Sequence, residues 1–189
     1  KMAVMRGASV TLVSGPVNIE PFIGIDVVNV KSAADMAEAV AARSEESDIV
    51  VMCSAVADYT PTHYSAQKVK KSDGELSIPL ARTTDILHTL GMKKKEGQML
   101  VGFSMETENL IENSRKKLSK KNADIICANT IADGGATGFA VDTNQVTLIT
   151  ETEVITLPLC TKEVTADLIL SHIVELQKEK YLSSHPLDE

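Results

Sequence analysis

Tryptophan is absent from the 189 residues of the chain, and only 3% of the residues are aromatic. The core must therefore rest on aliphatic side chains, and 43% hydrophobic with 24% charged residues is the composition of a soluble globular protein. Positive charge is also scarce, since 19 Lys and Arg face 26 Asp and Glu, for a formal net charge of −7. Because nonspecific phosphate binding needs an extended positive face, we expect no nucleic-acid or membrane partner, and any anion site must be local.

Cysteine is equally rare. Cys53, Cys127 and Cys160 lie far apart, each in or beside an apolar run, which predicts small buried thiols in a reducing compartment. A nucleophilic cysteine stays open as an alternative, although the four scattered histidines suggest no partner for it, and no spacing is typical of metal ligands. The chain also lacks an apolar run of about 18 residues and a signal-peptide pattern, so we expect a cytoplasmic protein.

Short β-rich apolar runs alternate with helical patterns along most of the chain. Ser32 and Asp35 form an S-x-x-D capping signature for one of the helices. The run 48–55 is apolar on both faces and is therefore expected in the middle of a parallel sheet. Three successive strand-helix-strand units predict an α/β protein with a Rossmann-like three-layer fold and a mainly parallel central sheet. Strands are expected at 8–13, 25–30, 48–55, 99–103 and 123–128, and helices at about 32–44, 84–94 and 106–121.

The remaining segments complete this arrangement. Residues 76–80 alternate as a half-exposed edge strand would. Near the end, 145–150 and 153–157 predict a C-terminal β-hairpin, and a final helix capped by Thr161 follows it.

The start of the chain does not fit a doubly wound fold. Residues 1–6 are apolar like a helix, but they make only about one turn before Gly7 begins the next strand. Such a fold would place a further strand and a ligand loop in front of them. We therefore expect a single nucleotide-binding domain over 1–189 whose N-terminal part is missing.

Polar residues follow three of the predicted parallel strands, namely Asp58, the segment 104–107 and Asn129. Ligands of open parallel sheets bind beyond the carboxyl ends of the strands, so these residues should converge. Simple packing at a strand-loop junction would account for them equally well. Neither common phosphate cradle is present, because the chain has no G-x-x-x-x-G-K-[ST] and reads S-G-P where a dinucleotide site would have G-x-G-x-x-G.

Two lysine clusters could serve an anion instead. Lys68, Lys70 and Lys71 lie in a loop, and a second cluster on the helix 106–121 places Lys117 and Lys121 one turn apart on a common face. A basic turn and a solvated helix face are the simpler interpretations of these clusters. The residues alone leave that choice open.

Taken together, these segments resemble the phosphopantothenate-cysteine ligases, also called phosphopantothenoylcysteine synthetases. The resemblance covers the chain from Arg6 to about Lys180, and the order and spacing of its pieces carry it. Those pieces are RGASVTLVSGPV (6–17), SAVADYTP (54–61), KVKK (68–71), GFSMET (102–107), SRKKLSKKNADIICAN (114–129) and GFAVDTNQVTLI (138–149).

The resemblance implies a ligase of coenzyme A biosynthesis, often the C-terminal domain of a bifunctional protein. Members of the family activate the carboxylate of 4′-phosphopantothenate with CTP, which releases pyrophosphate and leaves an acyl-cytidylate. The amine of L-cysteine then displaces CMP. Charge builds up between anionic reactants in such a reaction, so fixed cations and a Mg²⁺ ion on the triphosphate are expected to be the main catalytic resource.

The resemblance also implies roles for single residues. Lys68 matches the lysine of the K-x-K-K loop that forms the acyl-nucleotide, and Asn129 matches an Asn that contacts substrate. Thr84 stands where members often have proline, which puts the rigidity of the base-framing loop in question. Positions that contact the nucleotide are matched by Asp58, Ala81, Arg82, Thr83, Thr84, Phe103, Lys117 and Lys121.

The same resemblance implies partners for the chain and shows where the chain differs from the family. It implies a homodimer, formed at the hairpin or at the edge strand 76–80, and a possible fusion to a flavin-dependent phosphopantothenoylcysteine decarboxylase. Lys1 and Met2 resemble the end of an upstream N-x-S-S-G-K-M segment, so residues before Lys1 and between Met2 and Arg6 are expected to be absent. The alternatives are an NAD(P)-dependent oxidoreductase, which the missing G-x-G-x-x-G disfavours, and a non-catalytic nucleotide-binding module.

Overall fold

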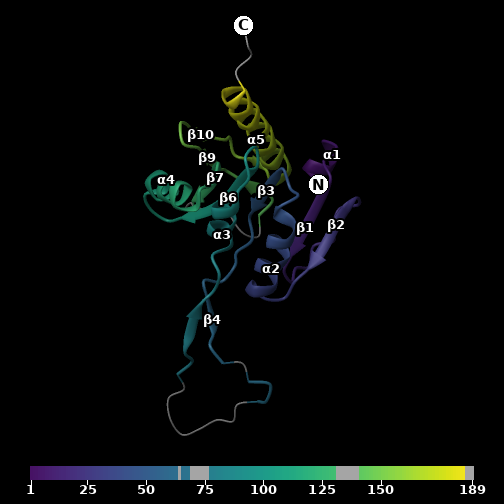
Figure 1. Cartoon of the computed structure of the whole chain (residues 1–189), viewed down its shortest axis with the longest axis vertical. Coiled ribbons are helices and arrows are strands. Elements are labelled where there is room, and N and C mark those ends of the chain that lie inside the picture. Colours follow the sequence, from purple (N-terminus) through teal and green to yellow (C-terminus); the bar gives the residue numbers. More distant parts are fainter. Residues whose placement is uncertain (64, 69–76, 131–140, 186–189) are drawn as a thin grey trace.

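The structure is a computed structural model that describes residues 1–63, 65–68, 77–130 and 141–185. Helices are interspersed with strands along it (Figure 1). The helices are α1 (Met2–Met5), α2 (Ala33–Ser44), α3 (Ile86–Lys93), α4 (Leu110–Lys121) and α5 (Lys162–Ser184). The strands are β1 (Val10–Ser14), β2 (Ile25–Asn29), β3 (Ile49–Met52), β4 (Tyr59–Pro61), β5 (Leu80–Arg82), β6 (Met99–Glu106), β7 (Ile125–Thr130), β8 (Thr143–Asn144), β9 (Thr147–Ile149), β10 (Val154–Thr156) and β11 (Cys160–Thr161).

The central sheet has five strands in the order β10-β9-β7-β6-β3. The strands β3, β6 and β7 run parallel, whereas β9 pairs antiparallel with both β7 and β10. Parallel neighbours need crossover connections, and α4 supplies the one between β6 and β7. A mixed α/β fold with a mostly parallel central sheet, a hairpin and a C-terminal helix is thereby confirmed.

Helices cover both faces of this sheet. Side chains alternate along a strand, so Leu100 faces α2 and α3 while its neighbour Val101 faces α5. Ile126 and Cys127 repeat the alternation on β7, where Ile126 packs on α4. Burial raises the pKa of the Cys127 thiol to about 12, so this thiol stays protonated and packs as a small apolar group, as predicted.

The strand β3 does not lie where the sequence predicts it. It is the last strand of the five-stranded sheet, and β1 and β2 form a separate parallel pair. Between the facing edges of β1 and β3 lies a cavity of about 160 Å³ lined by both strands and by α2. Apolar side chains on both faces of a strand predict that other elements pack above and below it, but they do not predict which strands pair with its edges. Even the faces of β3 are only partly covered, since Val51 is 40% exposed. Cys53, which follows β3, is exposed and not buried as predicted.

The local helix signals are confirmed. Ser32 and Asp35 form a complete capping box at the start of α2. The Thr161 side chain accepts a hydrogen bond from the backbone N–H of Val164 and caps α5. The one-turn helix α1 is fixed to α5 by Arg6, which donates to the Asp167 carboxylate over 2.8 Å. Among the described helices, none is both long and apolar enough to cross a membrane.

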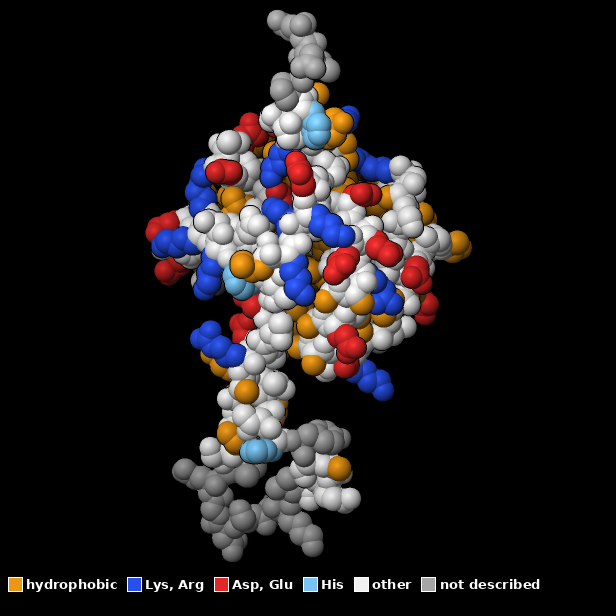
Figure 2. Space-filling model, viewed as in Figure 1, with side chains coloured by type: hydrophobic (Ala, Val, Ile, Leu, Met, Phe, Trp, Pro, Cys, Tyr) orange, Lys and Arg blue, Asp and Glu red, His pale blue; other side chains and the backbone are white. Residues whose placement is uncertain are grey.

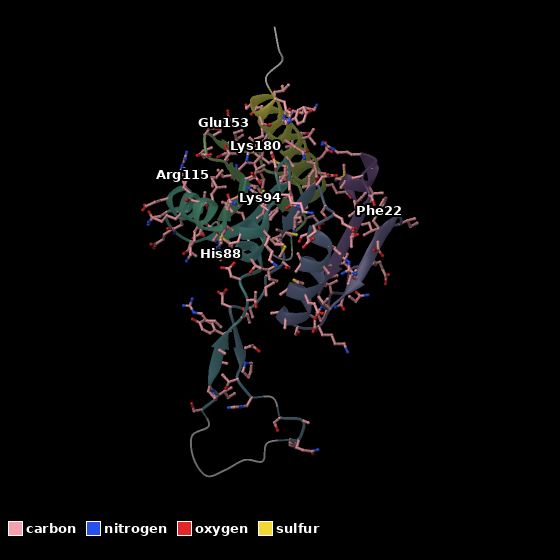
Figure 3. All side chains as sticks on the ribbon, viewed as in Figure 1. Phe22, His88, Lys94, Arg115, Glu153 and Lys180 are labelled. Atoms are coloured by element: carbon pink, nitrogen blue, oxygen red, sulfur yellow. The ribbon has the colours of Figure 1, made fainter. Side chains whose placement is uncertain are left out.

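One buried carboxylate ties three parts of the body together. Asp124 has a side chain that is only 2% exposed, and it accepts a hydrogen bond of 2.7 Å from the backbone N–H of Leu100. It also pairs with Lys94 at the end of α3, over 3.0 Å, and with Lys180 of α5. Figure 3 labels Lys94 near the centre of the body and Lys180 above it, beside α5. Two cations and a backbone donor therefore compensate the burial of this charge.

The strands β4 and β5 form an antiparallel arm that projects away from the body (Figure 1). Every residue of the two strands is exposed. The strand predicted at 76–80 begins later than expected, because β5 starts only at Leu80. Residue 76 itself lies outside the described residues. Pro79 has no N–H to give to a ladder, although its carbonyl accepts from the Thr62 N–H over 3.0 Å.

Candidate functional site

A cavity of about 430 Å³ opens where the arm joins the body. It lies between the end of β3, the start of α3, Phe103 of β6 and the C-terminal half of α4. Beyond the carboxyl ends of parallel strands is where open α/β sheets bind ligands. The lining residues are Met52, Ser54, Val56, Ala57, Asp58, Tyr59, Arg82, Thr83, Thr84, Asp85, Ile86, Leu87, Phe103, Lys117, Lys120 and Lys121.

The base of the arm forms one wall of the cavity. Its two segments are tied together by Thr83, whose backbone N–H donates to the Asp58 carbonyl over 2.9 Å. The Thr83 hydroxyl donates to the Ala57 carbonyl over 2.6 Å. Arg82 lies with its guanidinium carbon 5.9 Å from the centre of the Tyr59 ring. These contacts place Asp58 and Arg82 at the mouth of the cavity.

The start of α3 forms the second wall. Asp85 caps this helix by accepting the His88 N–H over 3.0 Å, and its carboxylate also pairs with Lys121 of α4. Burial acts to raise the pKa of Asp85, but the hydrogen bonds from Lys121 and the His88 N–H, with the charge of Lys121, leave that pKa below its ordinary value. The carboxylate therefore stays ionised and orients one lysine of the cavity.

The helix α4 is held very close to α3. A Cβ added at Gly91 would overlap the carbonyl oxygen of Lys121, so only glycine permits this approach. The Asn122 side chain donates to the Gly91 carbonyl over 2.8 Å, and a His88 ring nitrogen lies 3.0 Å from the Lys120 carbonyl. Figure 3 places His88 between the body and the arm. The end of α4 that carries the lysines is thus fixed on the body.

Lys117 lines the third wall, one turn before Lys121. Its ammonium donates to the Ser104 hydroxyl over 2.9 Å and lies 3.4 Å from the Glu106 carboxylate. The common face predicted for Lys117 and Lys121 is therefore observed, and each of the two lysines pairs with a carboxylate from another element. Blue Lys and Arg side chains gather around the junction of body and arm in Figure 2, among red carboxylates.

The structure brings most of the predicted nucleotide contacts together. Asn129 does not reach the cavity lining, because it is buried in β7 at 8% exposure. Ala81 belongs to the exposed strand β5, and Lys68 is an exposed residue beyond β4, so neither lines the cavity. Lys70 and Lys71 lie outside the described residues. The predicted residues that line it are Asp58, Arg82, Thr83, Thr84, Phe103, Lys117 and Lys121.

Sequence reasoning misses the ion pairs that hold these lysines. Asp85 is 36 positions from Lys121, and Glu106 is 11 positions from Lys117, so no helical spacing relates the members of either pair. The described residues contain no group of three or more His, Cys, Asp and Glu that could hold a metal ion. A metal in this cavity would therefore depend on few protein ligands and on oxygens of its substrate.

Known proteins resemble the chain over most of its length. It matches the family described as "DNA/pantothenate metabolism flavoprotein C-terminal domain" over residues 1–176. The Coenzyme A biosynthesis bifunctional protein CoaBC of Bacillus subtilis is 45% identical over 179 residues, which are 94% of this chain and 44% of that relative. A Cysteine/Cysteine sulfinic acid decarboxylase from an unknown prokaryotic organism is 45% identical over 170 residues, 88% of this chain and 47% of that protein.

A solved structure supports the same likeness. The crystal structure of the C-terminal domain of a Coenzyme A biosynthesis bifunctional protein CoaBC superposes with a TM-score of 0.77 at 40% sequence identity. The match covers 94% of this chain and 79% of that one. The chain therefore shares its fold with this domain and spans less than half the length of the curated relatives it matches.

Proposed function

Because the chain belongs to the family of the DNA/pantothenate metabolism flavoprotein C-terminal domain, we propose that it is a phosphopantothenate-cysteine ligase that uses CTP in coenzyme A biosynthesis. The observation that supports this most directly is the cavity at the strand ends, into which one helix face brings Lys117 and Lys121. Two fixed cations one helical turn apart suit neighbouring phosphate groups better than a neutral ligand.

The proposed reaction has two steps. A carboxylate oxygen of 4′-phosphopantothenate attacks the α-phosphorus of CTP, the bond to the β-phosphate oxygen breaks, and pyrophosphate leaves with its electron pair. The amine nitrogen of L-cysteine then attacks the acyl carbon, CMP leaves, and the nitrogen loses a proton. In the first step, lysines near the phosphates stabilise the negative charge that develops on the leaving pyrophosphate.

The charges that line the cavity fit a nucleotide bound with a metal ion. Its cations are Arg82, Lys117, Lys120 and Lys121, but Asp58 and Asp85 offset part of their charge. A triphosphate needs more positive charge than this balance leaves. Mg²⁺ would neutralise the triphosphate and polarise its α-phosphate, and it is usually bound through one or two carboxylates and the substrate phosphates. Asp58, which carries no ion pair among the described residues, is the carboxylate that suits it best.

Lys68 keeps its proposed catalytic role as a prediction. It lies outside the cavity lining, so it must approach the nucleotide from the side of the arm in order to act. Asn129 is likewise proposed to contact substrate, although it is buried behind the lining. We also propose that the arm mediates a homodimer, because the exposed fractions of Tyr59, Ile78 and Leu80 are 50%, 62% and 56%. The cytoplasmic location and the fusion to a flavin-dependent decarboxylase stay predictions.

Ligand-dependent thermal unfolding tests the nucleotide assignment. The melting temperature is measured with CTP, ATP and NADPH, each with and without Mg²⁺, since a ligand that binds only the folded chain raises it. We expect CTP with Mg²⁺ to give the largest rise. Stabilisation by NADPH alone would instead support the oxidoreductase.

A second assay tests the chemistry. Pyrophosphate release from CTP is followed with 4′-phosphopantothenate, before and after L-cysteine is added. We expect release only when 4′-phosphopantothenate is present. A chain that binds CTP but releases no pyrophosphate would support the non-catalytic binding module.

A further inference from the structure

Glu106 lies behind the cavity lining and is bonded to the groups that surround Lys117. One carboxylate oxygen accepts the Ser104 hydroxyl over 2.6 Å, and the other accepts the Asn113 side-chain amide over 3.2 Å. The first oxygen also lies 3.4 Å from the Lys117 ammonium. Burial acts to raise the pKa of Glu106, but the Ser104 hydrogen bond and the charge of Lys117 outweigh it, so the pKa is below its ordinary value.

This network engages only part of the hydrogen-bonding capacity of the Lys117 ammonium. Ser104 is 4% exposed and belongs to β6, so the oxygen that accepts from Lys117 has a fixed position. An ammonium has three N–H donors, and Ser104 and Glu106 engage two of those of Lys117. The same side chain lines the cavity. The third donor therefore remains for a ligand in that cavity.

We propose that Glu106 is a positioning residue of the nucleotide site. Together with Ser104 it holds the Lys117 ammonium at the cavity wall, so that a bound phosphate does not have to immobilise a flexible side chain. Ordering such a side chain on binding lowers affinity, and order that exists beforehand avoids the loss. This inference rests on the proposed function, because it takes the ligand of the cavity to be a nucleotide.

The neighbouring pair on the same helix shows what an ordinary surface ion pair looks like. Glu112 and Lys116 are i and i+4, their carboxylate and ammonium are 2.7 Å apart, and their side chains are 66% and 70% exposed. Lys117 and Glu106 are 34% and 17% exposed and come from different elements. Exposed pairs contribute little. Glu112 is therefore the matched control for Glu106.

Removal of Glu106 has two opposed effects on an anionic ligand. It frees Lys117, which weakens binding, and it removes a negative charge, which strengthens binding. Glu106→Gln abolishes the charge, whereas Glu106→Asp keeps the charge but withdraws it by one methylene. Positioning predicts weaker binding in both variants. If Glu106 only competed with phosphate for the lysine, Glu106→Gln would bind more tightly.

The first experiment measures CTP affinity with Mg²⁺ by calorimetry in the whole chain. We expect both Glu106 variants to bind about five- to tenfold more weakly than wild type, and Glu112→Gln to bind like wild type. In a Lys117→Met background, Glu106→Gln should cause no further loss, since it acts through that lysine. Circular dichroism confirms that each variant is folded.

The second experiment needs no nucleotide. Reductive methylation of each lysine is followed by mass spectrometry, because an ammonium held by hydrogen bonds reacts more slowly than a free one. We expect Glu106→Gln to speed the labelling of Lys117 and to leave that of Lys116 unchanged, and Glu112→Gln to do the reverse. General loosening of the fold would speed both, and would overturn a specific role.

The outcomes separate this inference from the function on which it rests. A wild-type chain that binds no CTP overturns the proposed function and this inference together. A wild-type chain that binds CTP, with Glu106→Gln and Glu106→Asp at the same or higher affinity, overturns the positioning role alone. Unchanged labelling of Lys117 in Glu106→Gln also overturns it.

Discussion

The two sides of the cavity are built in opposite ways. On the body side, Lys117 and Lys121 come from a helix in close contact with α3, and a carboxylate holds each ammonium. On the arm side, three residues of β4 pair with three of β5, and all of them are exposed. The groups proposed to bind phosphate are therefore ordered in advance. The group proposed for catalysis, Lys68, lies beyond the arm strand β4.

This contrast has a physical origin. A two-stranded hairpin without a core is marginally stable by itself, so the arm takes what order it has from its base. The body has the sheet, the helices on both faces and the ion pairs of Asp124. Many enzymes with reactive intermediates bind the substrate on a rigid part of the fold and close a more adaptable segment over it. Substitutions confined to the body or to the arm side can therefore test the two parts separately.

The largest effect is expected from Asp124→Ala in the body. It removes the carboxylate between Lys94 and Lys180 and leaves Lys94 part-buried without its charge partner. Loss of one member of a buried ion pair costs about 3–5 kcal/mol. Urea unfolding should show this as a lower midpoint with an unchanged slope. Glu112→Ala, at an exposed pair, should leave the midpoint in place. An equal loss in both variants would refute the claim that the Asp124 ion pairs contribute more to stability than a surface ion pair.

The next effect concerns Lys68→Ala on the arm side. Loss of a cation that stabilises developing charge should slow pyrophosphate release about 100- to 1,000-fold. CTP affinity and the unfolding midpoint should stay close to wild type, because Lys68 is exposed and lies outside the cavity lining. Lys178→Ala, at an exposed position of α5, serves as the control. Unchanged release would remove Lys68 from the mechanism.

A smaller loss is expected from Gly91→Ala, which tests the contact between α3 and α4. The added methyl group overlaps the Lys121 carbonyl, and overpacking of this kind costs about 1–3 kcal/mol. CTP binding should weaken too, since the helix that carries both lysines must shift. At Gly15 the same methyl group would meet only Met36 at 3.9 Å, so Gly15→Ala should be tolerated. If stability fell and CTP affinity did not change, the contact between α3 and α4 would not position the lysines of the site.

The smallest change in stability is expected from Ile78→Ser beside β5. Ile78 is 62% exposed, and surface substitutions usually change stability by less than about 0.5 kcal/mol. If the arm meets a second copy, sedimentation should nevertheless show weaker dimers. Ile19→Ser, at a position 81% exposed, changes an apolar side chain far from the arm in sequence and should leave association unchanged. Equal dimerisation in both variants would exclude Ile78 from the contact.

Local signals account for what could be predicted from the sequence. The capping box of Ser32 and the common face of Lys117 and Lys121 depend on residues within one helical turn. The likeness in order and spacing of motifs indicated the family. The pairs of Asp85 with Lys121 and of Glu106 with Lys117 could not be found in this way, because the fold alone brings their members together.

The predicted position of β3 in the middle of the sheet was wrong for a related reason. The apolar run that contains β3 predicts burial of its faces, but hydrogen bonding at its two edges depends on which strands arrive beside it. The alternation of 76–80 likewise predicts an edge strand, and only the structure shows that the pairing with β4 begins at Leu80.

The facing edges of β1 and β3 have a consequence for the behaviour of this chain in solution. Within the described residues, neither edge has a strand beside it, and Leu12 and Val51 expose apolar side chains there, each at 40%. Unpaired backbone donors and acceptors next to apolar side chains are a template for further strands, which other proteins block with lysine, proline or a bulge. We therefore expect this seam to promote self-association in concentrated samples, next to the end of β3 whose Met52 and Ser54 also line the candidate site.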